Sequence, residues 1–188
     1  NAKFLENAHQ FLIDSELTNL LTNFTIDYDL MVNQSEYLFS VWNILQPHNI
    51  IFHLDAITDH ESFAIELLSG KSQFPFVLEK RIVLAISQKT NLDDLVIWYN
   101  ELGIRHIQVM GIETIGRQGE PFSEKTLIII EQLQNLYPDL IISVDGGVSH
   151  ESIPKLAKLN IDSVVAGSAI FQGDIVDNIQ KLQKSAIL

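Results

Sequence analysis

The stretch IISVDGGVSH (141–150) places one carboxylate and two glycines directly after a run of apolar residues. If this run is a strand, Asp145 lies at its carboxyl end, where it could act as a general base or bind a metal. Gly146 and Gly147 carry no side chain, so the backbone can turn sharply and bring its N–H groups close to a ligand. The simpler interpretations are a turn-forming or capping acid and glycines that only tighten a loop.

A second glycine turn follows in VVAGSAIF (164–171), again between a strand-like run and the next helical pattern. Gly167 and Ser168 fall at this junction. Phosphate sites in barrel enzymes are commonly built from the loops after the last two strands. The two turns together therefore predict a phosphate site formed by Gly146, Gly147, Gly167 and Ser168.

Six short runs rich in Ile and Val alternate with longer amphipathic stretches, which is the pattern of an α/β protein with a parallel sheet. The predicted strands are 26–32, 50–56, 81–87, 106–112, 140–146 and 163–169. The predicted helices are 15–24, 35–45, 91–102, 123–137, 149–160 and 174–184, with Ser35, Asn91, Ser123 and Asp174 as capping residues.

Polar residues end nearly every predicted strand, and a barrel brings such ends to one mouth, whereas an open sheet spreads them out. These residues are Asp29, His53, Ser87, Glu113, Asp145 and Ser168. No G-x-G-x-x-G follows an early strand, which weakens a dinucleotide-binding fold. We therefore expect residues 1–188 to form a single (β/α)8 TIM barrel domain of which about six of the eight strands are visible. The sequence begins with Asn1, and we expect the first two strands to be missing from it.

The composition excludes several classes of function. The formal net charge of −12 argues against a nucleic-acid partner, whose phosphates would be repelled. No apolar run approaches the length of a membrane helix, and the sequence has no cysteine for a disulfide framework or thiolate chemistry. We expect a cytoplasmic protein with a small-molecule partner. Whether it forms a homo-oligomer is left open.

Several segments, in the same order along the chain, resemble the ribulose-phosphate 3-epimerase family. VDGGV and VVAGSAIF resemble its closing segment, and IIFHLDA resembles its F-H-x-E-A strand. DYDLMV resembles D-x-H-L-M-V, VLAISQKT resembles L-A-x-x-P-x-T, and VMGIETIGRQGEPF resembles the strand and flexible loop V-M-x-V-x-P-G-F-G-G-Q-x-F. The resemblance spans residues 26–172 and implies a barrel that binds a sugar phosphate.

The resemblance implies epimerisation of a ketose phosphate at C3 by proton transfer between two carboxylates, with a divalent metal (Zn, Mn or Mg). It makes Asp145 a metal ligand and acid/base, and it places Met31 and Met110 beside the substrate. The family's metal-binding His corresponds to Asp29 here, an oxygen donor that favours Mn²⁺ or Mg²⁺ over Zn²⁺. The second carboxylate belongs to an H-x-D-x-M-D-G segment that these residues do not contain.

Three functions remain open at this stage. The first is an active epimerase, and the second is a non-catalytic sugar-phosphate-binding barrel with a degraded metal site, which the changed position 29 favours. The third, a decarboxylase or synthase sharing only the phosphate site, lacks a lysine at a strand end. His53 is a substrate contact or a supporting residue. Arg117 is either a solvated loop charge or a clamp for an anion.

Overall fold

A computed structural model describes residues 24–31, 48–68, 82–117 and 119–187 of the chain. The predicted helix at 35–45 lies outside these residues, as does all but the last residue of the one at 15–24. Six parallel strands form one sheet in the order β1-β2-β3-β4-β5-β6. They are β1 (Asp27–Leu30), β2 (Asn49–His53), β3 (Ile82–Ile86), β4 (His106–Met110), β5 (Ile141–Asp145) and β6 (Ser163–Val165). The fold is thus half of an α/β barrel, as the sequence predicts.

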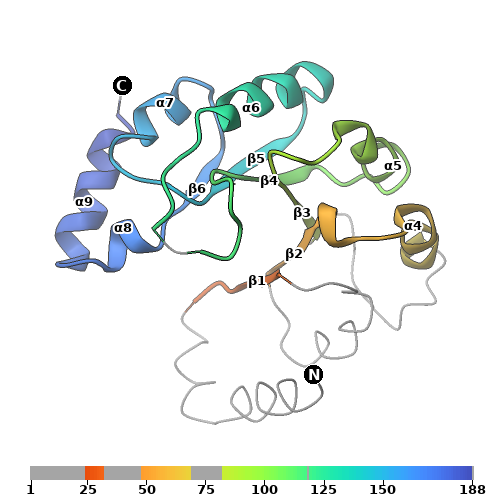
Figure 1. The fold of residues 1–188 in the computed structure, drawn as a ribbon, viewed down its shortest axis with the longest axis horizontal. Coiled ribbons are helices and arrows are strands. Elements are labelled where there is room, and N and C mark those ends of the chain that lie inside the picture. The colour runs from red at the N-terminus through yellow and green to blue at the C-terminus, as the bar shows by residue number, and fades with distance from the viewer. Residues whose placement is uncertain (1–23, 32–47, 69–81, 118, 188) are drawn as a thin grey trace, which may run out of the picture.

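Helices lie around the outside of the curved sheet (Figure 1). They are α4 (His60–Leu68), α5 (Leu95–Asn100), α6 (Lys125–Leu136), α7 (Ile153–Ala157), α8 (Ser168–Phe171) and α9 (Ile175–Ser185), with short 3₁₀ turns η2 (Leu54–Ala56) and η4 (Leu92–Asp94). Helices α4 to α7 lie between successive strands from β2 to β6, and α8 and α9 follow the last strand. No helix in the described ranges is long and apolar enough to span a membrane.

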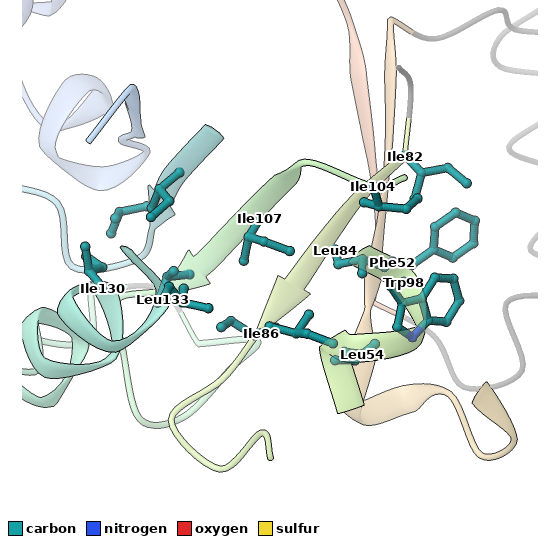
Figure 2. Packing of buried hydrophobic residues seen from close by; sticks show 14 of the residues in the cluster. Phe52, Leu54, Ile82, Leu84, Ile86, Trp98, Ile104, Ile107, Ile130 and Leu133 are labelled. Carbon is teal, nitrogen blue, oxygen red and sulfur yellow. The ribbon is translucent and has the colours of Figure 1, made fainter. Parts of the chain in front are cut away.

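The main hydrophobic core lies between the outer face of the sheet and these helices. Leu84 and Ile107 are at most 2% exposed and point toward the helices, where Trp98 of α5 and Leu133 of α6 pack in the same cluster (Figure 2). Because neighbouring side chains of a strand alternate between the two faces, the residues between these core positions point inward.

The inner face carries a small apolar cluster and several polar side chains. Ile51, Val83, Ala85 and Met110 form the cluster. The polar residues follow the same two-residue alternation and include Asp29, His53, Gln108, Ser143 and Asp145. These polar strand residues therefore point into the interior of the half-barrel.

Some boundaries differ from the sequence predictions. The helix at 60–68 was not expected, and the last strand ends at Val165, so that Ser168 begins the short helix α8. Capping by Asn91 and Asp174 is confirmed, since their side chains accept backbone N–H groups of Asp93 and Asp177. Capping by Ser123 is wrong: its hydroxyl donates to Gln88 Oε1 instead, at 3.2 Å.

Candidate active site

Asp145 is the last residue of β5 and is followed by two glycines in left-handed backbone conformations. Gly146 has φ 99° and Gly147 has φ 66°, a region that residues with a side chain rarely adopt. A Cβ on Gly147 would also lie 2.6 Å from the backbone nitrogen of Phe122. The turn after Asp145 therefore requires glycine at position 147 for conformation and for space.

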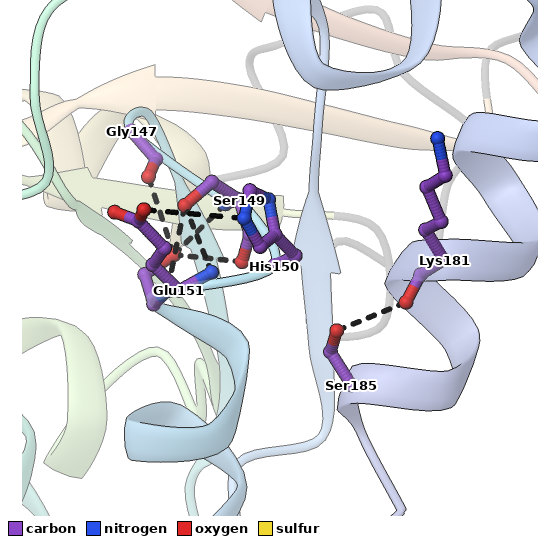
Figure 3. A network of polar contacts seen from close by, with 7 residues as sticks. Gly147, Ser149, His150, Glu151, Lys181 and Ser185 are labelled. Atoms are coloured by element: carbon purple, nitrogen blue, oxygen red, sulfur yellow. Dashed lines mark hydrogen bonds and ion pairs between the residues drawn. The ribbon is translucent and has the colours of Figure 1, made fainter.

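Serine side chains hold the loop beyond these glycines (Figure 3). Ser152 Oγ accepts the Ser149 N–H at 2.9 Å and lies 3.2 Å from the carbonyl oxygen of Gly147, to which it donates. Ser149 Oγ in turn accepts the N–H of Glu151 at 3.2 Å. These bonds fix the backbone of the turn, so the direction of its N–H groups is set before a ligand arrives.

A cavity of about 690 Å³ opens at this end of the sheet. Its lining brings together most of the residues that the sequence singles out: Met31, Met110, Asp145, Gly146, Gly147, Gly167 and Ser168. Met31 directly follows β1 and is 52% exposed, whereas Met110 on β4 is 2% exposed. The two glycine turns, which are twenty residues apart in the sequence, thus share one cavity wall.

Asp29 and His53 lie side by side on β1 and β2. His53 Nε2 is 2.8 Å from Asp29 Oδ1, and the His53 side chain is only 8% exposed. The other carboxylate oxygen of Asp29 lies 3.5 Å from Gln108 Nε2 on β4, three strands along the sheet from β1. The described cavity lining includes neither Asp29 nor His53.

The carboxyl group of Asp145 has a raised pKa. Burial is the largest cause, because removal from water disfavours the charged form, and the negative charge of Asp29 adds to it. The Gly146 N–H and the nearby His53 act in the opposite direction and are weaker. Asp145 therefore holds its proton more tightly than an exposed aspartate does, which suits a group that exchanges protons.

The described residues do not by themselves form a metal site. No group of three His, Asp or Glu side chains within the described ranges is arranged to hold an ion. Asp29 and Asp145 offer oxygen atoms, but the imidazole nitrogen that faces Asp29 is already engaged with it. A divalent ion at Asp29 and Asp145 would need ligands from outside this part of the chain, so we assign no chemical step to one.

Two other polar strand ends do not join the site. Ser87 Oγ donates to Asp55 Oδ2 at 2.5 Å, and Thr90 donates to the other oxygen of the same carboxylate. Glu113 is exposed and pairs with Lys125 at 2.9 Å, and this pairing lowers the pKa of its carboxyl group. These contacts hold loops in place, and neither Ser87 nor Glu113 is among the described residues that line the cavity.

Gln108 is a site residue that the sequence analysis missed. It lies two residues before Met110 on β4, so the alternation of the strand places both side chains on the inner face. The two-residue spacing between Gln108 and Met110 was the sequence signal that could have identified Gln108. Ile112, Glu120 and Phe171 also line the cavity and were not predicted, because they come from loops and a short helix whose positions depend on packing.

This arrangement first defines a class: half of a (β/α) barrel with a cavity at the carboxyl ends of its strands. A solved structure of 3-keto-L-gulonate-6-phosphate decarboxylase from Vibrio cholerae matches the fold with a TM-score of 0.65 at 18% sequence identity. The match covers 92% of this chain and 76% of that one.

The model of the ribulose-phosphate 3 epimerase family matches residues 1–171, and the chain belongs to that family. The ribulose-phosphate 3-epimerase of Schizosaccharomyces pombe is 27% identical over 128 residues, which cover 68% of this chain and 51% of that protein. The Methanocaldococcus jannaschii protein of the same name is 26% identical over 89% of this chain and 68% of its own length. The chain thus spans about half to two thirds of these relatives.

Proposed function

We propose that this protein is an isomerase that epimerises a ketose phosphate at C3, converting D-ribulose 5-phosphate to D-xylulose 5-phosphate or acting on a close analogue. The observation that carries the proposal is the position of Asp145. Its carboxyl group is half-buried, has a raised pKa, and lines the cavity whose wall contains both glycine turns. Family membership supports the same reaction.

In this proposal the carboxylate of Asp145 removes the proton on C3, which is acidic because it lies next to the carbonyl carbon. The electrons of the broken C–H bond pass to the carbonyl oxygen and give an enediolate. Return of a proton to the opposite face of C3 inverts the centre, and this requires a second acid across the sugar. No described residue is assigned that role.

Backbone N–H groups of the two glycine turns would bind the phosphate. Gly167 bears on this role through the space around it, because a Cβ there would meet no atom within 4 Å. Packing within the described residues therefore does not require glycine at this position. A ligand that approaches the backbone closely would require it.

A divalent metal and a cytoplasmic location stay predictions from the sequence. The changed residue at position 29 supports a second candidate, a barrel that binds the sugar phosphate without turning it over. The bond between Asp29 and His53 favours this candidate because it occupies the group found at the family's metal-binding position.

Exchange of the C3 proton of D-ribulose 5-phosphate with D₂O, followed by ¹H NMR, tests the proposal and separates the two candidates. We expect exchange with the wild-type chain, measured after EDTA treatment and again with Mn²⁺ or Zn²⁺ added. Asp145→Asn should slow it by about 10²- to 10⁴-fold, the usual contribution of an acid/base group. Asp94→Asn, at an exposed acid before α5, is the control and should not change it. Binding without exchange in every condition would favour the second candidate.

A further inference from the structure

The cavity beside Asp145 carries negatively charged groups, which oppose binding of the sugar phosphate proposed above. A phosphate monoester carries a charge of about −1.5 to −2 at neutral pH, and the cavity lining includes the carboxyl groups of Asp145 and Glu120. The chain as a whole has a formal net charge of −12. Among the described residues that line the cavity, Arg117 is the only lysine or arginine.

Within the described residues, the Arg117 guanidinium makes no hydrogen bond and only one long ion pair. Its nearest carboxylate contact is Glu120 Oε1, 3.9 Å from Nη1, which is too long for a hydrogen bond, and the Arg117 side chain is 73% exposed. Arg105 shows the opposite situation at the far end of the sheet. It donates to Asp139 at 2.9 Å and to the Tyr99 carbonyl at 2.7 Å, and it stacks on the Tyr99 ring.

The loop that carries Arg117 is tied to the glycine turn after Asp145. Gly111 N donates to the carbonyl oxygen of Asp145 at 2.6 Å, and its own carbonyl accepts Ser123 N at 2.8 Å. Between these anchors, the residues that line the cavity are Ile112, Gly116, Arg117, Gly119 and Glu120. The Phe122 backbone lies against Gly147. The cation is therefore attached to the same structural unit as the proposed phosphate-binding turn.

We propose that Arg117 binds the phosphate group of the substrate and supplies the positive charge that the backbone N–H groups lack. This inference rests on the proposed function. The planar guanidinium can donate two parallel hydrogen bonds to phosphate oxygens, which an ammonium cannot reproduce. Arg117 is thereby a residue for phosphate recognition that takes no part in proton transfer.

The test is isothermal titration of the full chain with D-ribulose 5-phosphate, with inorganic phosphate and with unphosphorylated D-ribulose. Arg117→Gln should raise the Kd for both phosphate-containing ligands about 10- to 100-fold, since hydrogen bonds to charged groups contribute roughly 1.5–3 kcal/mol. The Kd of Arg117→Lys should lie between the Kd of Arg117→Gln and that of the wild type. Binding of D-ribulose should not respond, which separates a phosphate contact from a general disturbance of the cavity.

Lys125→Gln is the matched control, because it removes a neighbouring exposed positive charge that does not line the cavity. It should change the Kd less than twofold, and Glu120→Gln should tighten phosphate binding. If the wild-type chain binds D-ribulose 5-phosphate and Arg117→Gln binds it equally well, the role of Arg117 is wrong and the proposed function stands. If the wild-type chain binds neither phosphate-containing ligand, the role of Arg117 and the proposed function are both wrong.

Discussion

The inner face of the sheet has a cluster of aspartate, histidine and amide groups at each end, and the two clusters differ in how their charges are satisfied. At the amino end of the strands, Asp27 accepts the backbone N–H of Asn49 at 3.0 Å and its side-chain amide at 3.1 Å. His106 is paired with Ser143 at 3.1 Å. This end resembles ordinary structural polar packing.

At the carboxyl end, two aspartates face the same interior. Asp29 is satisfied by His53, whereas Asp145 receives a backbone hydrogen bond from Gly146 and is opposed by burial and by the charge of Asp29. The two glycines that follow adopt conformations unfavourable for other residues. Burial and like charges therefore act on Asp145 at the end of the sheet where chemistry is proposed.

The largest expected effect on stability is at the strained turn. Gly147→Ala combines an unfavourable backbone conformation with a contact of 2.6 Å to the Phe122 backbone. It should lower the free energy of unfolding by about 1–3 kcal/mol, measured by urea denaturation. Gly167→Ala, where an added Cβ would meet no atom within 4 Å, is the control and should cost less than Gly147→Ala. Equal losses at both positions would contradict the difference described here.

Replacing the aspartate at the amino end of the sheet and the one at its carboxyl end should change the free energy of unfolding in opposite directions. Asp27→Ala leaves the N–H and side-chain amide of the buried Asn49 without their acceptor and should cost about 1–2 kcal/mol. Asp145→Asn should raise the free energy of unfolding at neutral pH. The raised pKa of wild-type Asp145 means that the folded state disfavours its carboxylate more than the unfolded state does, and asparagine removes this cost. Urea denaturation at pH 7 measures both, and a destabilised Asp145→Asn variant would remove the contrast between the ends.

The smallest expected effect is the pH dependence contributed by His106. Burial lowers the pKa of its imidazole below the ordinary 6.5, so the unfolded chain takes up a proton first as the pH falls below 6.5. Stability should therefore decline on acidification. His106→Gln should make that decline less steep by at most about 1.4 kcal/mol per pH unit. His150→Gln, at an exposed histidine, should leave the slope unchanged. Thermal unfolding across pH 5 to 8 compares the three proteins.

Much of the fold could be predicted because its signals are local. Short apolar runs ending in Asp145 or near Gly167 identify parallel strands and their carboxyl ends, and the described strands fall within one residue of the predicted runs or inside them. The helix at 60–68 was missed because its sequence lacks a clear apolar stripe: Phe63 and Ala64 are buried, but the apolar Ile65 next to them is 56% exposed.

The sequence by itself determined the residue types that end each strand and the glycine turn after Asp145, since strand alternation and backbone freedom are properties of neighbouring residues. Only the tertiary structure decided which of these residues meet. Asp29 contacts His53 from 24 residues away and Gln108 from 79, and these pairings depend on strand register and on the curvature of the sheet. The place of Arg117 on the cavity of Asp145 was likewise fixed by how one loop packs against another, which no local pattern encodes.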